Sequence, residues 1–172
     1  MTIALKNAIR KADGERVLAV FAPPHPRFVR LMLHCKAVWM EKDGCWMIDR
    51  DREEDVLKAY MHVFRADPYT DPKDKKVNVV VSIDGLISET EYWGLGRLLL
   101  SRYKRDHKVR TGKGVKLLEG EFYTSGGSVK RPWIGQPCGD RAVLLVRGVP
   151  LGMANRWCEH TENMEIAHDS AK

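Results

Sequence analysis

The sequence predicts an α+β protein, and three observations lead to this fold class. The chain has 172 residues, of which 44% are hydrophobic and 30% charged, which suits one medium domain or two small packed lobes. Its hydrophobic pattern changes between helical and strand periods several times within residues 3–64. Its second half contains short apolar runs of strand length that are separated by turn residues. Mixed or antiparallel sheets combined with a few helices fit this pattern.

The N-terminal part, residues 1–66, is predicted to form a β-α-β-β-α module. Apolar residues on one face predict a short helix near residues 3–9, which the following Asp-Gly pair would end. The apolar run at 16–22 has the length of a strand and ends at two prolines, so it is predicted to form a strand. A helix is then expected from Pro26 to about Lys36, since proline suits the first helical turn and apolar residues recur on one face.

A hairpin and a second helix complete this predicted module. Two β-prone runs, AVWM and CWMI, flank the turn EKDG, and its Asp-Gly pair is a strong hairpin signal. Trp39 and Trp46 would therefore lie on paired strands. Apolar residues at helical spacing predict the last helix, which ends near Phe64 and whose N-terminus Asp49 or Asp51 would cap.

The hairpin carries the motif W-x₆-W within the frame FVRLMLHCKAVWMEKDGCWMIDRDREEDVLKAY. In this order of elements, residues 16–64 resemble small modules attached to replication and plasmid-transfer proteins and, more distantly, the HARP domain of annealing helicases. The resemblance implies that the module handles nucleic acid. Such modules often have Leu-Gly shortly before the first tryptophan and Asp directly after it. The corresponding positions here hold Cys35, Lys36, Ala37 and Met40.

Residues 67–76 combine two prolines with a run of charges, which predicts a linker to a second α+β domain at residues 77–158. That domain opens with a buried-strand pattern at 77–83. The sequence SETE, which begins at Ser88, is a capping box, so a long helix is predicted to start at residue 89.

Beyond this helix the chain is predicted to be rich in β-structure. The run VKLLEGEFYT, which begins at Val115, contains two short strand candidates, and residues 142–148 form another. The polar residues 159–172 are expected to form a frayed tail.

The net charge of +6 is concentrated in residues 97–131, which contain ten basic and three acidic residues. Tyr103 and Tyr123 are interleaved with these cations, and Trp133 follows them. Cations that replace counterions and rings that stack on bases are what binding to nucleic acid requires. The alternative is a solvated helix face followed by basic loops.

The loop SGGS at residues 125–128, followed by Lys130 and Arg131, offers an anion nest, because glycines permit the backbone angles that such a nest needs. A plain flexible hairpin loop is the alternative. Neither the phosphate-binding spacing GxxxxGK[ST] nor the dinucleotide fingerprint GxGxxG occurs in the sequence.

Enzymatic interpretations depend on few residues. His107, in the sequence RDHK, is the candidate general acid or base of a small nuclease. Four residues with zinc-ligand side chains lack the tight pairs of structural zinc sites, and free thiols are the alternative. These residues are Cys35, Cys45, Cys158 and His160. We therefore favour a non-enzymatic protein and assign no catalytic residue, no metal and no cofactor.

The N-terminal residues lack the apolar core of a secretory signal, and the apolar runs are too short for a membrane helix. The four cysteines are few and irregularly spaced, as expected for thiols in a reducing compartment. These features predict a cytoplasmic protein without a membrane span.

The leading hypothesis is a non-enzymatic protein that binds DNA or RNA, of the accessory type that phages and plasmids carry. The alternative is an inhibitor or adaptor that docks its basic face on an acidic protein partner, and the second alternative is a small nuclease that uses His107. The residues predicted to bind nucleic acid are cations of the basic segment and three tryptophans: Arg97, Arg102, Lys104, Arg105, Lys108, Arg110, Lys113, Lys130, Arg131, Trp133, Trp39 and Trp46.

Overall fold

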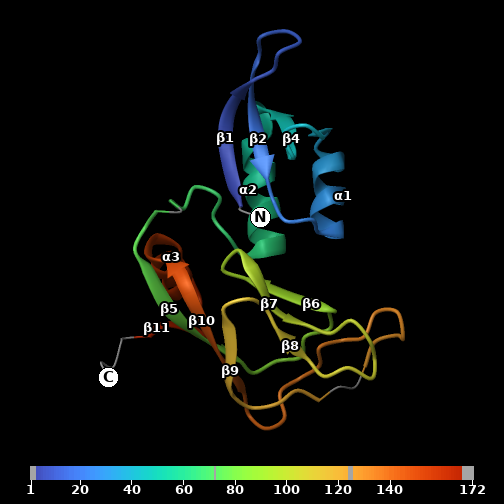
Figure 1. Cartoon of the computed structure of the whole chain (residues 1–172), viewed down its shortest axis with the longest axis vertical. Coiled ribbons are helices and arrows are strands. Elements are labelled where there is room, and N and C mark those ends of the chain that lie inside the picture. Colours follow the sequence, from blue (N-terminus) through green and yellow to red (C-terminus); the bar gives the residue numbers. More distant parts are fainter. Residues whose placement is uncertain (1–2, 72, 124–125, 168–172) are drawn as a thin grey trace. The chain divides into compact units, whose positions relative to one another are not determined.

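The fold is that of a computed structural model, which describes residues 3–71, 73–123 and 126–167. The chain divides into two compact units, unit 1 at Met1–Thr70 and unit 2 at Asp71–Lys172 (Figure 1). The division falls inside the predicted linker segment. Each unit combines at least one helix with at least one antiparallel sheet, which confirms the α+β fold class.

Unit 1 contains a four-stranded antiparallel sheet in the order β1-β2-β4-β3, together with two helices (Figure 1). Its elements are β1 (Ala4–Ile9), β2 (Arg16–Phe21), α1 (Pro26–His34), β3 (Val38–Met40), β4 (Cys45–Asp49), the short 3₁₀ helix η1 (Arg50–Arg52) and α2 (Glu53–Phe64). The strand β2, the helix α1, the hairpin β3-β4 and the helix α2 all lie where the sequence predicted them.

The helix predicted near residues 3–9 is wrong, because this segment is strand β1. Every residue of β1 pairs with β2, and Leu5 lies opposite Val20. Most of β2 is buried, so its backbone N–H and C=O groups need a partner strand along both edges. A helix of this length would also be too short to be stable without packing. The order of unit 1 is therefore β-β-α-β-β-α rather than β-α-β-β-α.

The core of unit 1 is aromatic. Phe28, Tyr60 and Phe64 are fully buried, and their ring centroids lie between 5.1 and 6.4 Å apart. The Tyr60 hydroxyl lies 2.8 Å from the carbonyl oxygens of both Ala4 and Phe21, which face each other across β1 and β2. Burial raises the pKa of Tyr60, so the hydroxyl stays protonated and donates to this strand pair. The contact fastens α2 to the sheet.

The predicted capping of α2 by Asp49 or Asp51 is wrong. The N-cap residue is Arg52, which makes no side-chain capping bond, because η1 lies between β4 and the helix. Three acidic residues in the first turn complement the partial positive charge of the helix N-terminus instead.

The described residues of unit 2 form two antiparallel sheets, in the orders β11-β5-β10-β9 and β6-β7-β8, and one helix. Its elements are β5 (Lys76–Ile83), β6 (Glu91–Gly94), β7 (Arg97–Ser101), β8 (Arg110–Thr111), β9 (Val115–Glu119), β10 (Ala142–Pro150), α3 (Leu151–His160) and β11 (Met164–Ala167). The strands predicted at 77–83 and 142–148 are confirmed as β5 and β10.

The long helix predicted from residue 89 is wrong, because β6 and β7 form a hairpin there. Leu95 and Gly96 both have positive φ angles, 52° and 71°, as a two-residue type I′ turn requires. A Cβ atom at Gly94 would lie 2.8 Å from the Cδ1 atom of Leu99, so a larger residue there would require the Leu99 side chain to shift. The apolar spacing that suggested one helix face belongs to two paired strands.

The C-terminal part is more ordered than predicted. Helix α3 follows β10 directly, and the Asp74 carboxylate accepts a hydrogen bond of 2.6 Å from the N–H of Gly152 in its first turn. Residues 164–167 of the predicted frayed tail form β11, which pairs with β5, whereas residues 168–172 lie outside the described residues. No helix in the described ranges has the length and apolarity that crossing a membrane requires.

Candidate nucleic-acid interface

Arg102 lies inside unit 2 and not on its surface. The residue is 1% exposed, and its guanidinium donates to the carbonyl oxygens of His107 at 3.1 Å, of Trp133 at 2.7 Å and of Arg105. Its backbone N–H donates to the carbonyl of Thr90 at 2.8 Å. The predicted phosphate contact of Arg102 is therefore wrong, because its guanidinium is buried against backbone carbonyls.

The buried guanidinium joins two basic loops. One loop, residues 102–109, supplies the carbonyls of Arg105 and His107, and the other, the hairpin at 126–133, supplies the carbonyl of Trp133. Each bond from a charged donor to a buried carbonyl is stronger than a neutral hydrogen bond. Arg102 therefore positions the cations of both loops in one region of unit 2.

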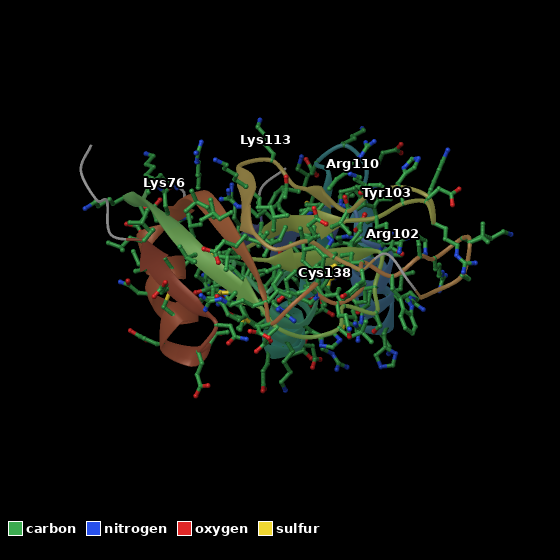
Figure 2. The ribbon with its side chains drawn as sticks, turned by 90° about the horizontal axis from the view of Figure 1, so that it is seen from below. Lys76, Arg102, Tyr103, Arg110, Lys113 and Cys138 are labelled. Carbon is green, nitrogen blue, oxygen red and sulfur yellow. The ribbon has the colours of Figure 1, made fainter. Side chains whose placement is uncertain are left out.

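These loops, together with β8 and the turn after it, present seven exposed cations, which we call the basic surface. They are Lys104, Arg105, Lys108, Arg110, Lys113, Lys130 and Arg131. Figure 2 shows Arg110 and Lys113 projecting from one edge of the view. Within the described part of the chain, none of the seven side chains forms an ion pair or hydrogen bond. Their charges are therefore available to an acidic partner.

Arg97, another predicted phosphate contact, has a structural role instead. Its guanidinium donates to the carbonyl oxygens of Arg147 at 2.9 Å and Gly148 at 3.2 Å. These carbonyls lie at an irregularity of β10, where the register with β5 shifts. Burial lowers the pKa of Arg97. No local pattern in the sequence indicates this contact, because the two acceptors are backbone atoms about fifty residues away.

Two cations beside the basic surface were absent from the predicted set. Arg147 is exposed, and its backbone N–H donates at 2.8 Å to the carbonyl of Gly114, the residue after Lys113. Lys116 is exposed on β9, directly opposite Leu145 of β10. Only the pairing of β9 with β10 brings Arg147 to this place, so a charge count along the chain could not find it.

The predicted aromatic residues fall into two groups. Trp39 and Trp46 lie opposite each other on β3 and β4, with ring centroids 5.2 Å apart and planes at 61°. Trp39 is 45% exposed and Trp46 is half-buried, and both belong to unit 1 rather than to the unit that carries the basic surface. Trp133 is 36% exposed and lies in the same hairpin as Lys130 and Arg131.

The SGGS loop is a hairpin turn. The N–H of Ser128 donates to the carbonyl of Arg131 at 3.1 Å, and the N–H of Trp133 donates to that of Gly126 at 3.3 Å. A Cβ atom at Gly126 would lie 2.5 Å from the Trp133 ring, so the indole packs against the glycine backbone. Of the two interpretations of this loop, an anion nest and a hairpin loop, the described residues support the hairpin loop. Ser125 lies outside the described residues.

A pocket of about 340 Å³ opens beside the first basic loop. Its lining combines apolar side chains from β7, β9 and the following segment with three polar ones. The lining residues are Leu100, Lys108, Val109, Thr111, Leu117, Glu121 and Phe122. Lys108 belongs both to this pocket and to the basic surface, so a ligand could contact the two together.

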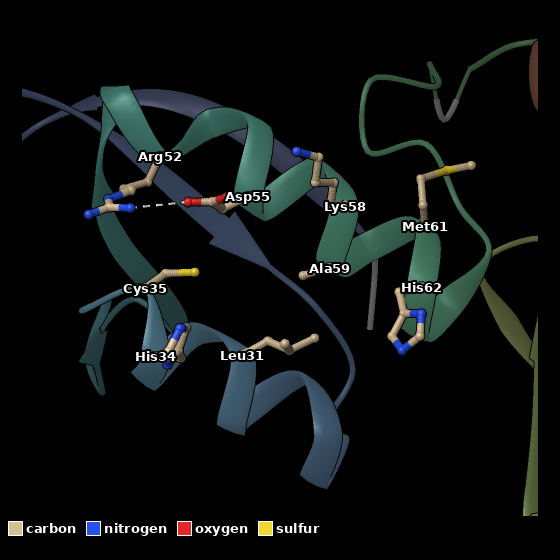
Figure 3. A pocket seen from close by; sticks show the side chains of 9 residues that line it. All are labelled: Leu31, His34, Cys35, Arg52, Asp55, Lys58, Ala59, Met61 and His62. Atoms are coloured by element: carbon tan, nitrogen blue, oxygen red, sulfur yellow. Dashed lines mark hydrogen bonds and ion pairs between the residues drawn. The ribbon is translucent and has the colours of Figure 1, made fainter.

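Unit 1 has a larger groove, of about 920 Å³, between α1 and α2 (Figure 3). Leu31, Cys35 and Ala59 point into the space between the helices, and an ion pair of 3.3 Å between Arg52 and Asp55 lies at one end. The pKa of the Cys35 thiol is raised, mainly by burial, so this thiol is a weak nucleophile. The lining of the groove also includes His34, Lys58 and His62.

The enzymatic alternatives involve His107 and the side chains considered as zinc ligands. His107 is half-buried, and its carbonyl serves as an acceptor for Arg102. No group of three or more His, Cys, Asp or Glu side chains in the described ranges is arranged to hold a metal ion, and all four cysteines are free thiols.

Comparisons with protein-family models, curated proteins and solved structures found no match for this chain.

Proposed function

We propose that this chain is a non-enzymatic nucleic-acid-binding protein that contacts the phosphate backbone through the basic surface. The observation that carries the proposal is the set of seven exposed cations without intramolecular partners among the described residues. Five of them lie on the two loops that the buried Arg102 joins, and Arg110 and Lys113 lie on β8 and in the turn after it. Cations of this kind release condensed counterions when they bind phosphates, which gives affinity without the need for catalytic groups. An accessory role in nucleic-acid handling agrees with the resemblance of residues 16–64 to replication and plasmid-transfer modules.

Single strands are the favoured form of the ligand. Trp133, Tyr103 and Tyr123 are exposed aromatic residues near the cations in the sequence, and unpaired bases stack on such rings. The cations lie on irregular loops and a two-residue strand rather than on a helix that would enter a major groove. Both features suit a strand whose bases are accessible.

Fluorescence anisotropy with labelled single-stranded DNA, single-stranded RNA and duplex DNA tests the proposal. The variant Lys104→Gln/Lys108→Gln/Arg110→Gln/Lys113→Gln removes four charges of the basic surface but keeps Arg102. We expect wild-type binding that weakens as salt rises. In the variant, the log–log salt slope should be smaller by roughly 0.7 for each single-strand phosphate that it no longer neutralises.

A matched control is Lys11→Gln/Arg16→Gln/Arg30→Gln/Lys42→Gln, which removes four exposed charges of unit 1 and leaves the basic surface intact. This variant should keep most of the affinity, because only general charge is removed. Equal decreases in affinity for the two variants, or no binding at low salt, would contradict the proposal. A complex of defined stoichiometry with an acidic protein, without oligonucleotide binding, would support the adaptor alternative.

A further inference from the structure

The pocket beside the first basic loop has polar groups of opposite sign. Lys108 provides an ammonium and Glu121 a carboxylate, and within the described residues neither side chain is engaged in an ion pair. Both residues are exposed, as is Thr111, which also lines the pocket. A ligand here would meet donors on one part of the wall and acceptors on another.

The remaining lining is apolar. Leu100 and Phe122 are buried, and Val109 and Leu117 are half-buried, so the base of the pocket is made of hydrocarbon and one aromatic ring. The volume of about 340 Å³ is at the lower end of the roughly 300–1,000 Å³ typical of small-molecule sites. A flat, largely apolar ring system with polar edges fits such a wall better than a sugar or a free phosphate.

The cations around the pocket indicate where such a ring system would come from. Lys108 lines the pocket. Arg110 lies two residues further along the chain, on β8, and Lys113 lies in the turn after that strand. A strand whose phosphates contact these side chains would place its bases next to the pocket. This inference depends on the proposed function, because it takes the phosphate contacts as given.

The polar pattern distinguishes among the bases. A carboxylate only accepts hydrogen bonds, through two oxygens, and guanine presents two adjacent donors, N1–H and N2–H₂. Guanine also carries the acceptors O6 and N7, which suit an ammonium. Adenine and cytosine each place an acceptor next to their amino donor, and the single N–H of thymine or uracil lies between two carbonyls. Guanine alone offers two adjacent donors to the two oxygens of Glu121 together with acceptors for Lys108.

We propose that this pocket binds a guanine base of a single strand, with Glu121 accepting from the N1 and N2 donors and Lys108 donating to O6 or N7. The base would leave the strand and insert its ring between the apolar side chains, as single-stranded RNA and DNA bases do in protein pockets. Thr111 offers a further hydroxyl to the base or its sugar.

The test compares two labelled thymidine oligomers of about ten nucleotides, which differ only in one central guanine. Wild-type protein should bind the guanine-containing strand about fivefold to a hundredfold more tightly. Glu121→Gln should bring this ratio close to one, because an amide replaces one acceptor by a donor. Glu119→Gln, an equal charge change on an exposed residue of β9 outside the pocket, should keep the ratio.

Isothermal titration with guanosine 5′-monophosphate and thymidine 5′-monophosphate examines the pocket without a strand. Preferential binding of the guanine nucleotide that Glu121→Gln abolishes is the expected result. A strand ratio near one in wild-type protein, or a guanine preference that survives in Glu121→Gln, overturns the pocket assignment but leaves the proposed function intact. Absence of binding to every strand overturns the proposed function, and absence of nucleotide binding as well overturns both.

Discussion

Arg10 in unit 1 and Arg102 in unit 2 each bond at least three acceptors, but the acceptors are of different kinds. In unit 1, Arg10 bonds the carboxylates of Asp13, Glu15 and Asp49 at 2.7–3.1 Å, with its side chain 38% exposed. In unit 2, Arg102 is buried, and its guanidinium donates to three backbone carbonyls. The first arginine neutralises surface charge, whereas the second organises loops.

The two units also differ in how their cations are paired. Unit 1 pairs several of its cations internally, as Arg52 with Asp55 and Lys58 with Glu54 also show. Unit 2 uses neutral carbonyls to hold its central arginine, so no carboxylate is drawn into the basic surface by these bonds. The seven cations of the basic surface therefore remain exposed and unpaired within the described residues.

The largest effect is expected from Arg102→Ala. The change removes a buried charged donor and leaves the carbonyls of His107 and Trp133 without it, which we expect to lower the free energy of unfolding by about 2–5 kcal/mol. Urea denaturation followed by circular dichroism measures the decrease, and the basic loops should lose their binding activity with it. Arg141→Ala, at an exposed position, should change stability by less than about 0.5 kcal/mol. Equal stabilities for the two variants would show that Arg102 does not hold the loops.

The burial of Arg102 marks the limit of what the sequence could predict. A run of cations indicates a charged segment, but it does not indicate which member turns inward, because the acceptor at Trp133 is a backbone atom 31 residues away. Every residue type has a backbone carbonyl that can accept a hydrogen bond, so the residue at the acceptor position gives no signal in the sequence. The same reason explains why the anchoring role of Arg97 could not be predicted.

Local signals predicted unit 1 better than unit 2. The Asp-Gly turn of the β3-β4 hairpin and the proline at the start of α1 act within a few residues, and both elements lie where expected. Strands β1, β6 and β7 form by pairing with other strands, and no local sequence signal identifies those strands. Apolar residues three or four positions apart over a short segment also fit a helix. The proximity of Arg147 to the turn at Lys113 arises from strand pairing in the same way.

A second expected effect concerns two exposed tyrosines, one in each unit, that donate to a glutamate. Partial desolvation of the hydroxyl, together with the bond to Glu53, raises the pKa of Tyr69 to about 12. Partial desolvation and the bond to Glu91 raise the pKa of Tyr103 as well. Titration of the tyrosinate absorbance should therefore show Glu53→Gln bringing one group back toward its usual pKa of about 10.

The sign of the associated stability follows from the raised pKa. The folded state holds the Tyr69 proton more tightly than the unfolded state, so the contribution is complete below pH of about 10 and is lost as pH rises toward 12. Glu91→Gln is the matched change in unit 2, and it should move the pKa of Tyr103 and leave that of Tyr69 unchanged. A titration curve that Glu53→Gln does not alter would contradict the assigned hydrogen bond.

The smallest effect is expected from Arg10→Gln, which removes the charge at the centre of the exposed cluster. Partly exposed ion pairs gain little over hydration and are screened by salt, so Tm should fall far less than for Arg102→Ala, and the difference should shrink at about 1 M salt. Lys11→Gln removes an exposed charge next to Arg10 that makes no ion pair within the described residues, and it serves as the control. Thermal unfolding at low and high salt measures both. A large decrease that salt does not reduce would mean that Arg10 acts through packing, and the contrast between the two arginines would then lie in their acceptors alone.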